Sequence, residues 1–207
     1  MKYPVARFKS LALALKELEP FIRDGNHLQT GKPFRQLRGM RSREVLANWL
    51  ICVAANFEHR GDRLSFTSDP IGGDGLIVDS QTKVTWQTEH VIVLRQRLTS
   101  ATEKNIETRI LEAVGDKRDK GGAAYATGKQ LVVFLDSGAG CWFPNKVARE
   151  LPRPLYFDDV WVVGLCQLDL GEYVYAVTQL DLSDGNTPAW LVRIGRNFDK
   201  WGVERIQ

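Results

Sequence analysis

The chain has 207 residues, of which 43% are hydrophobic and 26% are charged, as in an ordinary soluble globular protein of one domain. No stretch approaches the ~20 apolar residues that a membrane span requires, and residues 1–9 lack the apolar core of a signal peptide. We therefore expect a cytoplasmic protein with no membrane partner. The net charge of +3 does not by itself indicate a nucleic-acid partner.

Three cysteines, Cys52, Cys141 and Cys166, stand far apart in the sequence. An odd and scattered set argues against a disulfide framework, and it lacks the close ligand pairs of a zinc site. Cys52 and Cys166 lie inside apolar runs, so we interpret them as small core residues in a protein of a reducing compartment.

Residues 1–41 are predicted to form a helix followed by a basic loop. Apolar residues recur at helical spacing over residues 8–19, and Pro20 ends the pattern. Residues 24–40 contain three glycines and a proline, which favours a loop. Five basic residues follow one another from this loop onward without an intervening acidic residue: Lys32, Arg35, Arg38, Arg41 and Arg43. The cluster is interpreted either as a phosphate contact or as a solvated basic surface.

Residues 42–140 are predicted to form the core of the domain. A helix begins at Ser42, a suitable N-cap, and runs to about Ala55. It is apolar nearly all round, which is typical of a buried helix, and Glu44 and Asn48 stand out as polar residues. Three strands are predicted next, over residues 63–67, 75–79 and 83–94.

A second core helix is predicted after the capping box Ser100–Glu103, with a buried stripe that includes Ile106 and Ile110 and a stop at Gly115. Residues 116–122 are charged and glycine-rich, so we interpret them as an exposed, mobile loop. Residues 131–135 are five consecutive apolar residues, which suit a central strand buried on both faces. A strand–helix–strand connection of this length implies a parallel pair.

The predicted fold class is α/β (α+β), with a single domain over residues 1–207 and a mixed central sheet. The core has the element order αβββαβ. Residues 141–207 add a short helix after Pro144 and three strands, over residues 160–168, 173–182 and 189–194. These strands either extend the sheet or form a small antiparallel lobe.

Two acidic residues stand on neighbouring strands of this core. Gly72, Gly73 and Gly75 surround Asp74 and leave its carboxylate open to a ligand, and Glu89 lies in the middle of the third strand. Because paired strands lie about 5 Å apart, the two carboxylates can converge on one cation. Hard oxygen ligands suit Mg²⁺ or Mn²⁺, the ions that serve phosphodiester hydrolysis.

This arrangement resembles the PD-(D/E)xK nuclease superfamily over residues 42–136, in topology and in the spacing of the acidic residues. The resemblance implies a first metal ligand at Asp74, a second at Glu89, and a further carboxylate from the first core helix at Glu44. It also implies a metal-dependent endonuclease acting on DNA. Such enzymes need two active sites to cut both strands, which makes a homodimer an arrangement to test.

The lysine that this family places two residues after its second acidic ligand is replaced here by Val91. Lys129, at the start of the neighbouring strand, is the best candidate for a relocated lysine. Gln87 shares a strand face with Glu89 and is a candidate to orient a water molecule. His90 points to the opposite face, but its main-chain carbonyl is a further candidate metal ligand.

Several of these residues also have purely structural interpretations. Asp74 could be a turn residue of a glycine-rich hairpin, and Glu44 could complement a helix dipole. Asp79 and Asp136 are interpreted as turn or cap residues at strand ends. An acidic residue such as Glu89 in a strand headed for the core is costly unless it has a partner.

Two other classes of function stay open. One is a cysteine hydrolase with Cys141 as nucleophile, for which the histidine would have to lie upstream, as His90 does. The other is a catalytically inactive module on a nuclease-like core that binds nucleic acid or serves assembly. In that module, Val91 in place of the lysine indicates that cleavage activity has been lost. Aromatic residues of the C-terminal strands, such as Trp161 and Trp190, would stack on bases.

Overall fold

The computed structural model describes residues 9–95, 104–136, 138 and 140–207, and its centre is a mixed eight-stranded sheet. The strands are β3 (Leu64–Thr67), β4 (Gly75–Asp79), β5 (Thr85–Val93), β6 (Lys129–Leu135), β7 (Asp159–Asp169), β8 (Glu172–Gln179), β9 (Ala189–Ile194) and β10 (Trp201–Arg205). Their order across the sheet is β10-β9-β8-β7-β6-β5-β4-β3. The pairs β5–β6 and β6–β7 are parallel, and the remaining neighbours are antiparallel.

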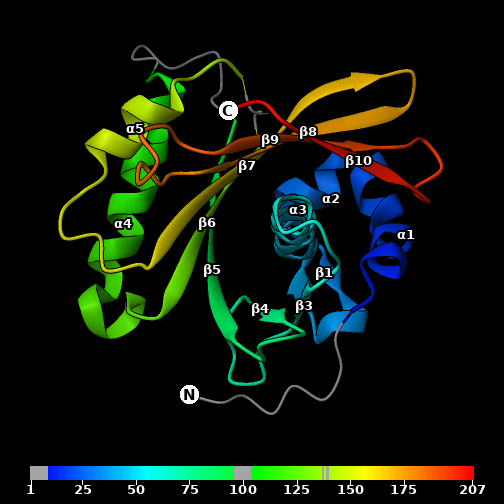
Figure 1. Ribbon diagram of the computed structural model, residues 1–207, viewed down its shortest axis with the longest axis horizontal. Coiled ribbons are helices and arrows are strands. Elements are labelled where there is room, and N and C mark those ends of the chain that lie inside the picture. Colours follow the sequence, from blue (N-terminus) through cyan, green and yellow to red (C-terminus); the bar gives the residue numbers. More distant parts are fainter. Residues whose placement is uncertain (1–8, 96–103, 137, 139) are drawn as a thin grey trace.

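Helices cover both faces of this sheet (Figure 1). One face carries α1 (Leu11–Arg23), α2 (Gly25–Thr30) and α3 (Ser42–Glu58), and the other carries α4 (Ile106–Ala126) and α5 (Pro144–Glu150). Between α2 and α3 the chain forms a short 3-10 helix, Arg35–Leu37, and a two-stranded ribbon of β1 (Pro33–Phe34) and β2 (Met40–Arg41).

The predicted fold class is confirmed. The order α3-β3-β4-β5-α4-β6 is the αβββαβ order expected from the sequence, and β5 and β6 are parallel as the connection through a helix implies. β7, β8 and β9 continue the same sheet beyond β6, so the C-terminal strands extend the sheet. The edge strand β10 was not predicted, because its five residues carry only two apolar side chains.

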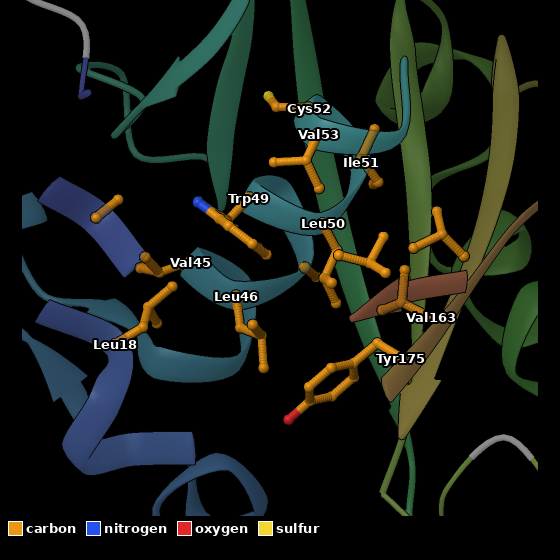
Figure 2. Close-up of a cluster of buried hydrophobic side chains, with 14 of the residues drawn as sticks. Leu18, Val45, Leu46, Trp49, Leu50, Ile51, Cys52, Val53, Val163 and Tyr175 are labelled. Atoms are coloured by element: carbon orange, nitrogen blue, oxygen red, sulfur yellow. The ribbon is translucent and has the colours of Figure 1, made fainter. Parts of the chain in front are cut away.

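The larger hydrophobic core forms around α3, which lies between α1 and the sheet (Figure 2). Leu46 and Leu50 of α3 point toward Val163 and Tyr175 of the sheet. Trp49 is fully buried, and its indole N–H donates to the carbonyl of Leu11 at 2.9 Å. Because neighbours surround α3, its sequence is apolar on every side.

The second core joins α4 and α5 to the opposite face of the sheet. Ile110 and Val114 of α4 are buried with Leu131 and Val133 of β6. Side chains alternate along β6, so its intervening residues contribute to the core around α3. The prediction of a central strand buried on both faces is therefore confirmed.

Two predicted helix ends are wrong. α1 continues through Pro20 to Arg23, because the buried side chains of Leu18 and Ile22 hold both of its halves on the core. α4 continues through Gly115 and the whole of residues 116–122, with non-helical backbone only at Gly122 (φ 55°). The expected mobile loop is therefore mostly helix.

The start of α4 also differs from the prediction. The capping box Ser100–Glu103 lies outside the described residues, and the N-cap of α4 is Asn105, whose side chain accepts from the backbone N–H of Thr108 at 2.8 Å. The predicted loop over residues 24–40 contains α2 and the β1–β2 ribbon.

Cys52 is buried as predicted, but Cys166 is exposed, so its assignment to the core is wrong. Cys166 lies where the β7–β8 register shifts between Leu165 and Gln167, and this bulge interrupts the alternation of buried side chains. Among the described helices, none combines the length and the apolar composition that a membrane crossing requires.

Candidate functional site

The register of β4 and β5 brings the two predicted acidic residues together. Gly75 pairs with Thr88, so Asp74 and Glu89 face each other one step beyond the last pair of this ladder. The backbone N–H of His90 donates to Oδ2 of Asp74 at 2.8 Å, which holds that carboxylate against β5. Burial, and next the negative charge of Glu89, raise the pKa of Asp74 above its usual value.

The loop before β4 is shaped by Asp69, a buried residue that the sequence analysis did not single out. Its carboxylate accepts from the backbone N–H of Ile71 at 2.8 Å and of Gly73 at 3.2 Å. A Cβ at Gly73 would lie 2.5 Å from Oδ2 of Asp69, so this turn requires glycine. The result is a tight turn that delivers Asp74 to the start of β4.

Glu89 is surrounded by positive charge. Lys129 Nζ lies 3.1 Å from Oε1, Lys117 Nζ lies 3.3 Å from Oε2, and the Tyr125 hydroxyl donates to Oε2. Burial alone would raise the pKa of Glu89, but the Tyr125 and Lys129 hydrogen bonds and the charge of Lys117 bring it below its usual value. Lys129 was the predicted substitute for the lysine missing at Val91, and it contacts Glu89 directly.

Lys117 and Tyr125 were missed because they lie beyond the predicted end of α4. Lys117 belongs to the face of α4 that carries Ile110 and Val114, at helical spacing, whereas Tyr125 follows the non-helical Gly122. Continuing that period past Gly115 would have predicted Lys117 on the side of the sheet. Burial raises the pKa of the Tyr125 hydroxyl, and the negative charge of Glu89 adds to the effect.

Glu44 comes to the same region from the N-terminus of α3. Its Oε2 accepts from the backbone N–H of Arg41 at 2.8 Å, so it satisfies a backbone donor at the start of the helix. Burial and the charge of Asp74 raise the pKa of Glu44 to about 7. We call Glu44, Asp74 and Glu89 the acidic cluster.

An open pocket of about 270 Å³ leads to Glu44 and Asp74 of the acidic cluster. Arg38 and Arg41 line it together with Glu44, Asp69 and Asp74. Positive side chains thus border a pocket whose wall carries carboxylates. We call this pocket the rim pocket.

The five predicted nucleic-acid contacts divide into two groups. Lys32, Arg35, Arg38 and Arg41 are exposed. Arg43 is buried, and its guanidinium donates to the carbonyls of Leu28 and Gln29 at the end of α2. Because these contacts hold it in place, the prediction of Arg43 as a phosphate contact is wrong.

The two remaining predicted residues have other contacts. Gln87 donates to Oδ2 of Asp69 at 3.0 Å, so it supports the turn before Asp74. The His90 imidazole is buried on the face of α3, with Nε2 3.3 Å from Oγ1 of Thr88. Burial, and next the charge of Lys117, lower the pKa of His90 to about 3. His90 contacts Asp74 through its backbone N–H, and its imidazole lies on the other side of the sheet from Glu89.

Unsatisfied polar atoms lie behind the acidic cluster. Three buried atoms there lack a hydrogen-bond partner within the described part of the chain: Nδ2 and Oδ1 of Asn48 and Nδ1 of His90. A Cβ at Gly75 would lie 2.5 Å from Asn48 Nδ2 and 3.0 Å from Thr88 Oγ1, so the Asn48 amide packs against the glycine that follows Asp74.

The donor chemistry of the acidic cluster fits a hard divalent cation. Its donor atoms are carboxylate oxygens. Burial raises the pKa of Glu44 and of Asp74, and repulsion by a neighbouring carboxylate adds to each rise. A bound cation would offset this cost of keeping the carboxylates charged. Over residues 9–95, 104–136, 138 and 140–207, however, no three acidic, histidine or cysteine side chains converge closely enough to form a complete cage. At most two of these side chains, with water for the remaining ligands, can therefore hold a cation there.

Cys141, the nucleophile of the alternative hydrolase, is exposed, whereas the His90 imidazole is buried beside Thr88. No hydrogen bond in the described residues joins Cys141 to a histidine. The placement gives this alternative no support. Comparison of the chain with protein-family models, with curated proteins and with solved structures finds no match.

Proposed function

We propose that this protein is a metal-dependent nuclease that hydrolyses phosphodiester bonds in DNA, with Asp74 and Glu89 as ligands of Mg²⁺ or Mn²⁺. The observation that carries the proposal is the pairing of these two carboxylates across β4 and β5, beside a pocket bordered by Arg38 and Arg41. The αβββαβ order around them supports the resemblance to the PD-(D/E)xK superfamily.

The basic residues have the first role in this proposal. Arg38 and Arg41 are exposed at the rim pocket, where they would hold phosphates of the DNA backbone. Lys32 and Arg35 extend this basic surface along the same segment. The phosphate groups are thereby held within reach of the acidic cluster.

The acidic cluster has the second role. Asp74 and Glu89 would bind the cation, and Glu44 would contribute through water. When bound, the cation supplies charge stabilisation at the scissile phosphate and lowers the pKa of a water molecule. Lys117 and Lys129 place two ammonium groups beside Glu89, where they supply the positive charge that Val91 cannot.

The same contacts favour a second candidate, an inactive nucleic-acid-binding module. Both oxygens of Glu89 already have partners in Lys117, Lys129 and Tyr125. Two ammonium groups can take the place of a cation in a protein that keeps the fold and the basic surface but does not cleave. The two candidates differ in whether Glu89 binds a divalent ion.

A cleavage assay tests the nuclease directly. Purified protein is incubated with end-labelled single- and double-stranded DNA oligonucleotides, with plasmid and with RNA, in Mg²⁺ or Mn²⁺. We expect cleavage of DNA that falls about 10²–10³-fold in Asp74→Asn and in Glu89→Gln, as for other groups that stabilise transition-state charge. Asp116→Asn, an exposed acidic residue of α4, is the matched control and should cleave normally.

Cleavage that survives both substitutions would refute the assignment, and DNA binding without cleavage would favour the inactive module. Sedimentation of the protein with and without duplex DNA tests the accompanying proposal of a homodimer, which would supply a second active site for the other strand.

A further inference from the structure

A second pocket lies on the opposite face of the sheet from Glu89, under the C-terminal end of α3. It has a volume of about 350 Å³, at the lower end of the ~300–1,000 Å³ range of small-molecule sites. Its walls include Trp86 of β5, Trp161 of β7 and Trp190 of β9. We call it the tryptophan pocket. Gln130 lines it, whereas the preceding residue, Lys129, points to Glu89 on the other face.

The tryptophans give this pocket flat walls. Trp161 and Trp190 stack on each other, with ring centroids 5.9 Å apart and planes inclined by 25°. Both are almost fully buried, which fixes their orientation. Trp86 is only half-buried and keeps part of its surface free at the pocket. A flat aromatic ligand can stack there without moving the pair behind it.

One indole in this pocket lacks a hydrogen-bond partner. Trp190 Nε1 donates to Oε1 of Glu58 at 2.6 Å, and Glu58 is further paired with Arg205 at 3.1 Å. Trp161 Nε1, by contrast, is buried with no partner within the described residues. Buried indole N–H groups normally have an acceptor, so this N–H is an unmet hydrogen bond in a residue that lines the pocket.

A carboxylate in the same wall lacks a cation. Asp159 accepts from the amide of Gln179 and from the backbone N–H of Val160, and no ion pair involves it in the part of the chain described. Burial, and next the charges of Asp181 and Asp158, raise its pKa to about 7, and the two hydrogen bonds offset only part of this rise. A ligand with N–H donors would provide what this carboxylate lacks.

The charge of the tryptophan pocket excludes a phosphate. Glu58, Asp159 and Asp184 line it, and its one arginine, Arg205, is already paired with Glu58. An anionic group would meet repulsion there. The ligand is therefore not an anion, and a flat ligand with N–H donors and a carbonyl or ring-nitrogen acceptor on its edge suits these walls.

From this geometry we propose that the tryptophan pocket binds a nucleobase, stacked on Trp86 with its donor edge against Asp159. Guanine and cytosine each carry an amino group and a carbonyl, whereas adenine lacks the carbonyl and uracil and thymine lack the amino group, so guanine and cytosine fit best. The base can belong to a free nucleoside or to an unpaired position of a nucleic-acid strand. Binding here needs no divalent cation and goes beyond the proposed nuclease.

Tryptophan fluorescence tests the proposal in EDTA, where nuclease chemistry is absent. The full chain is titrated with each of the four nucleosides and, separately, with single-stranded tetranucleotides. We expect saturable quenching, strongest for guanosine and cytidine, and affinity at least tenfold weaker in Asp159→Asn. Asp169→Asn, the same substitution on an exposed residue of β7, should bind as the wild type does. Trp86→Leu, at a half-buried position, should lose binding while circular dichroism shows an unchanged fold.

If only the nucleosides bind, the ligand is a free nucleoside. If the tetranucleotides bind more tightly, the ligand is an unpaired base in a strand. The proposal is overturned if no base quenches the fluorescence at millimolar concentration, if Asp159→Asn and Asp169→Asn behave alike, or if tetramethylammonium binds where nucleosides do not. Glu89→Gln should leave base binding unchanged, so failure of the nuclease and failure of this site are separate results.

Discussion

At the scale of single residues, the chemistry of the site depends on how charge is distributed over the acidic cluster. Glu89 is neutralised by Lys117 and Lys129, whereas Glu44 and Asp74 have mainly backbone N–H donors as partners. The pKa of Glu89 therefore falls, and that of Asp74 rises. Two neighbouring carboxylates with pKa values moved apart are typical of a functional site.

The Tyr125 hydroxyl is expected to stabilise the charged form of Glu89. Tyr125→Phe keeps the edge-on packing against Phe157, with ring centroids 6.4 Å apart, and removes the hydroxyl that donates to Glu89 and accepts from Lys117 at 3.4 Å. We expect a loss of about 1 kcal/mol in the free energy of unfolding, measured by urea denaturation. Tyr156→Phe, at an exposed tyrosine, is the control. Equal effects of the two substitutions would show that the hydroxyl contributes nothing.

Glu44 is expected to make stability depend on pH. Its pKa rises from 4.5 to about 7 on folding, so its contribution is fully present below pH 4.5 and is lost as the pH rises through 7. In EDTA the unfolding temperature of the wild type should therefore fall between pH 5 and pH 8. Glu44→Gln keeps an acceptor for the Arg41 N–H, and its unfolding temperature should fall less over the same pH range. Parallel curves for the two proteins would contradict the raised pKa.

At the scale of elements, sequence patterns predicted the strands better than the helix ends. The bounds of β4 and β9 and the αβββαβ order follow from apolar periodicity, which packing reinforces. Helix ends were placed at Pro20 and Gly115 from local propensity, and in both helices tertiary burial outweighs that propensity.

The residues of the candidate site that strand register places were predicted from the sequence. The residues that α4 places were not. Asp74 and Glu89 meet because paired strands leave little freedom in their placement. Lys117 and Tyr125 come from the continuation of α4 and could not be placed once that helix was ended early. The burial of Arg43 depends on the C-terminal end of α2, which was interpreted as loop.

Two glycines test the continuation of α4. Gly115→Ala has nothing within 4 Å of the new Cβ and should raise the free energy of unfolding by about 0.5–1 kcal/mol, as expected in a helix. Gly121→Ala places its Cβ 2.5 Å from Cβ of Tyr125 and should lower it. Urea denaturation measures both. A loop at this position would give no gain for Gly115→Ala.

At the scale of the whole molecule, the sheet separates Glu89 from the tryptophan pocket. Glu89 lies on the side of α4, and α3 with the tryptophan pocket lies on the other side (Figure 1). The rim pocket lies beside the N-terminal end of α3, where Glu44 stands in the first turn and Arg41 precedes the helix. The buried apolar helix α3 therefore positions both sites at its two ends.

The exposed basic residues should determine how DNA binding depends on salt. The double substitution Arg38→Gln/Arg41→Gln removes two phosphate contacts and should reduce the slope of log K against log salt by about 1.4–1.8. Fluorescence anisotropy of labelled DNA in EDTA, over a series of KCl concentrations, measures this slope. Lys146→Gln/Arg149→Gln, at two exposed basic residues of α5, is the control. An unchanged slope in the first variant would place the DNA elsewhere.

Titration calorimetry with Mn²⁺ at pH 8 measures whether Asp74 and Glu89 bind a divalent cation. We expect the wild type and Asp116→Asn to bind the ion, and the affinity to fall at least about tenfold in Asp74→Asn and in Glu89→Gln. A wild type that gives no heat of binding, or variants that bind as tightly as it does, would contradict the claim.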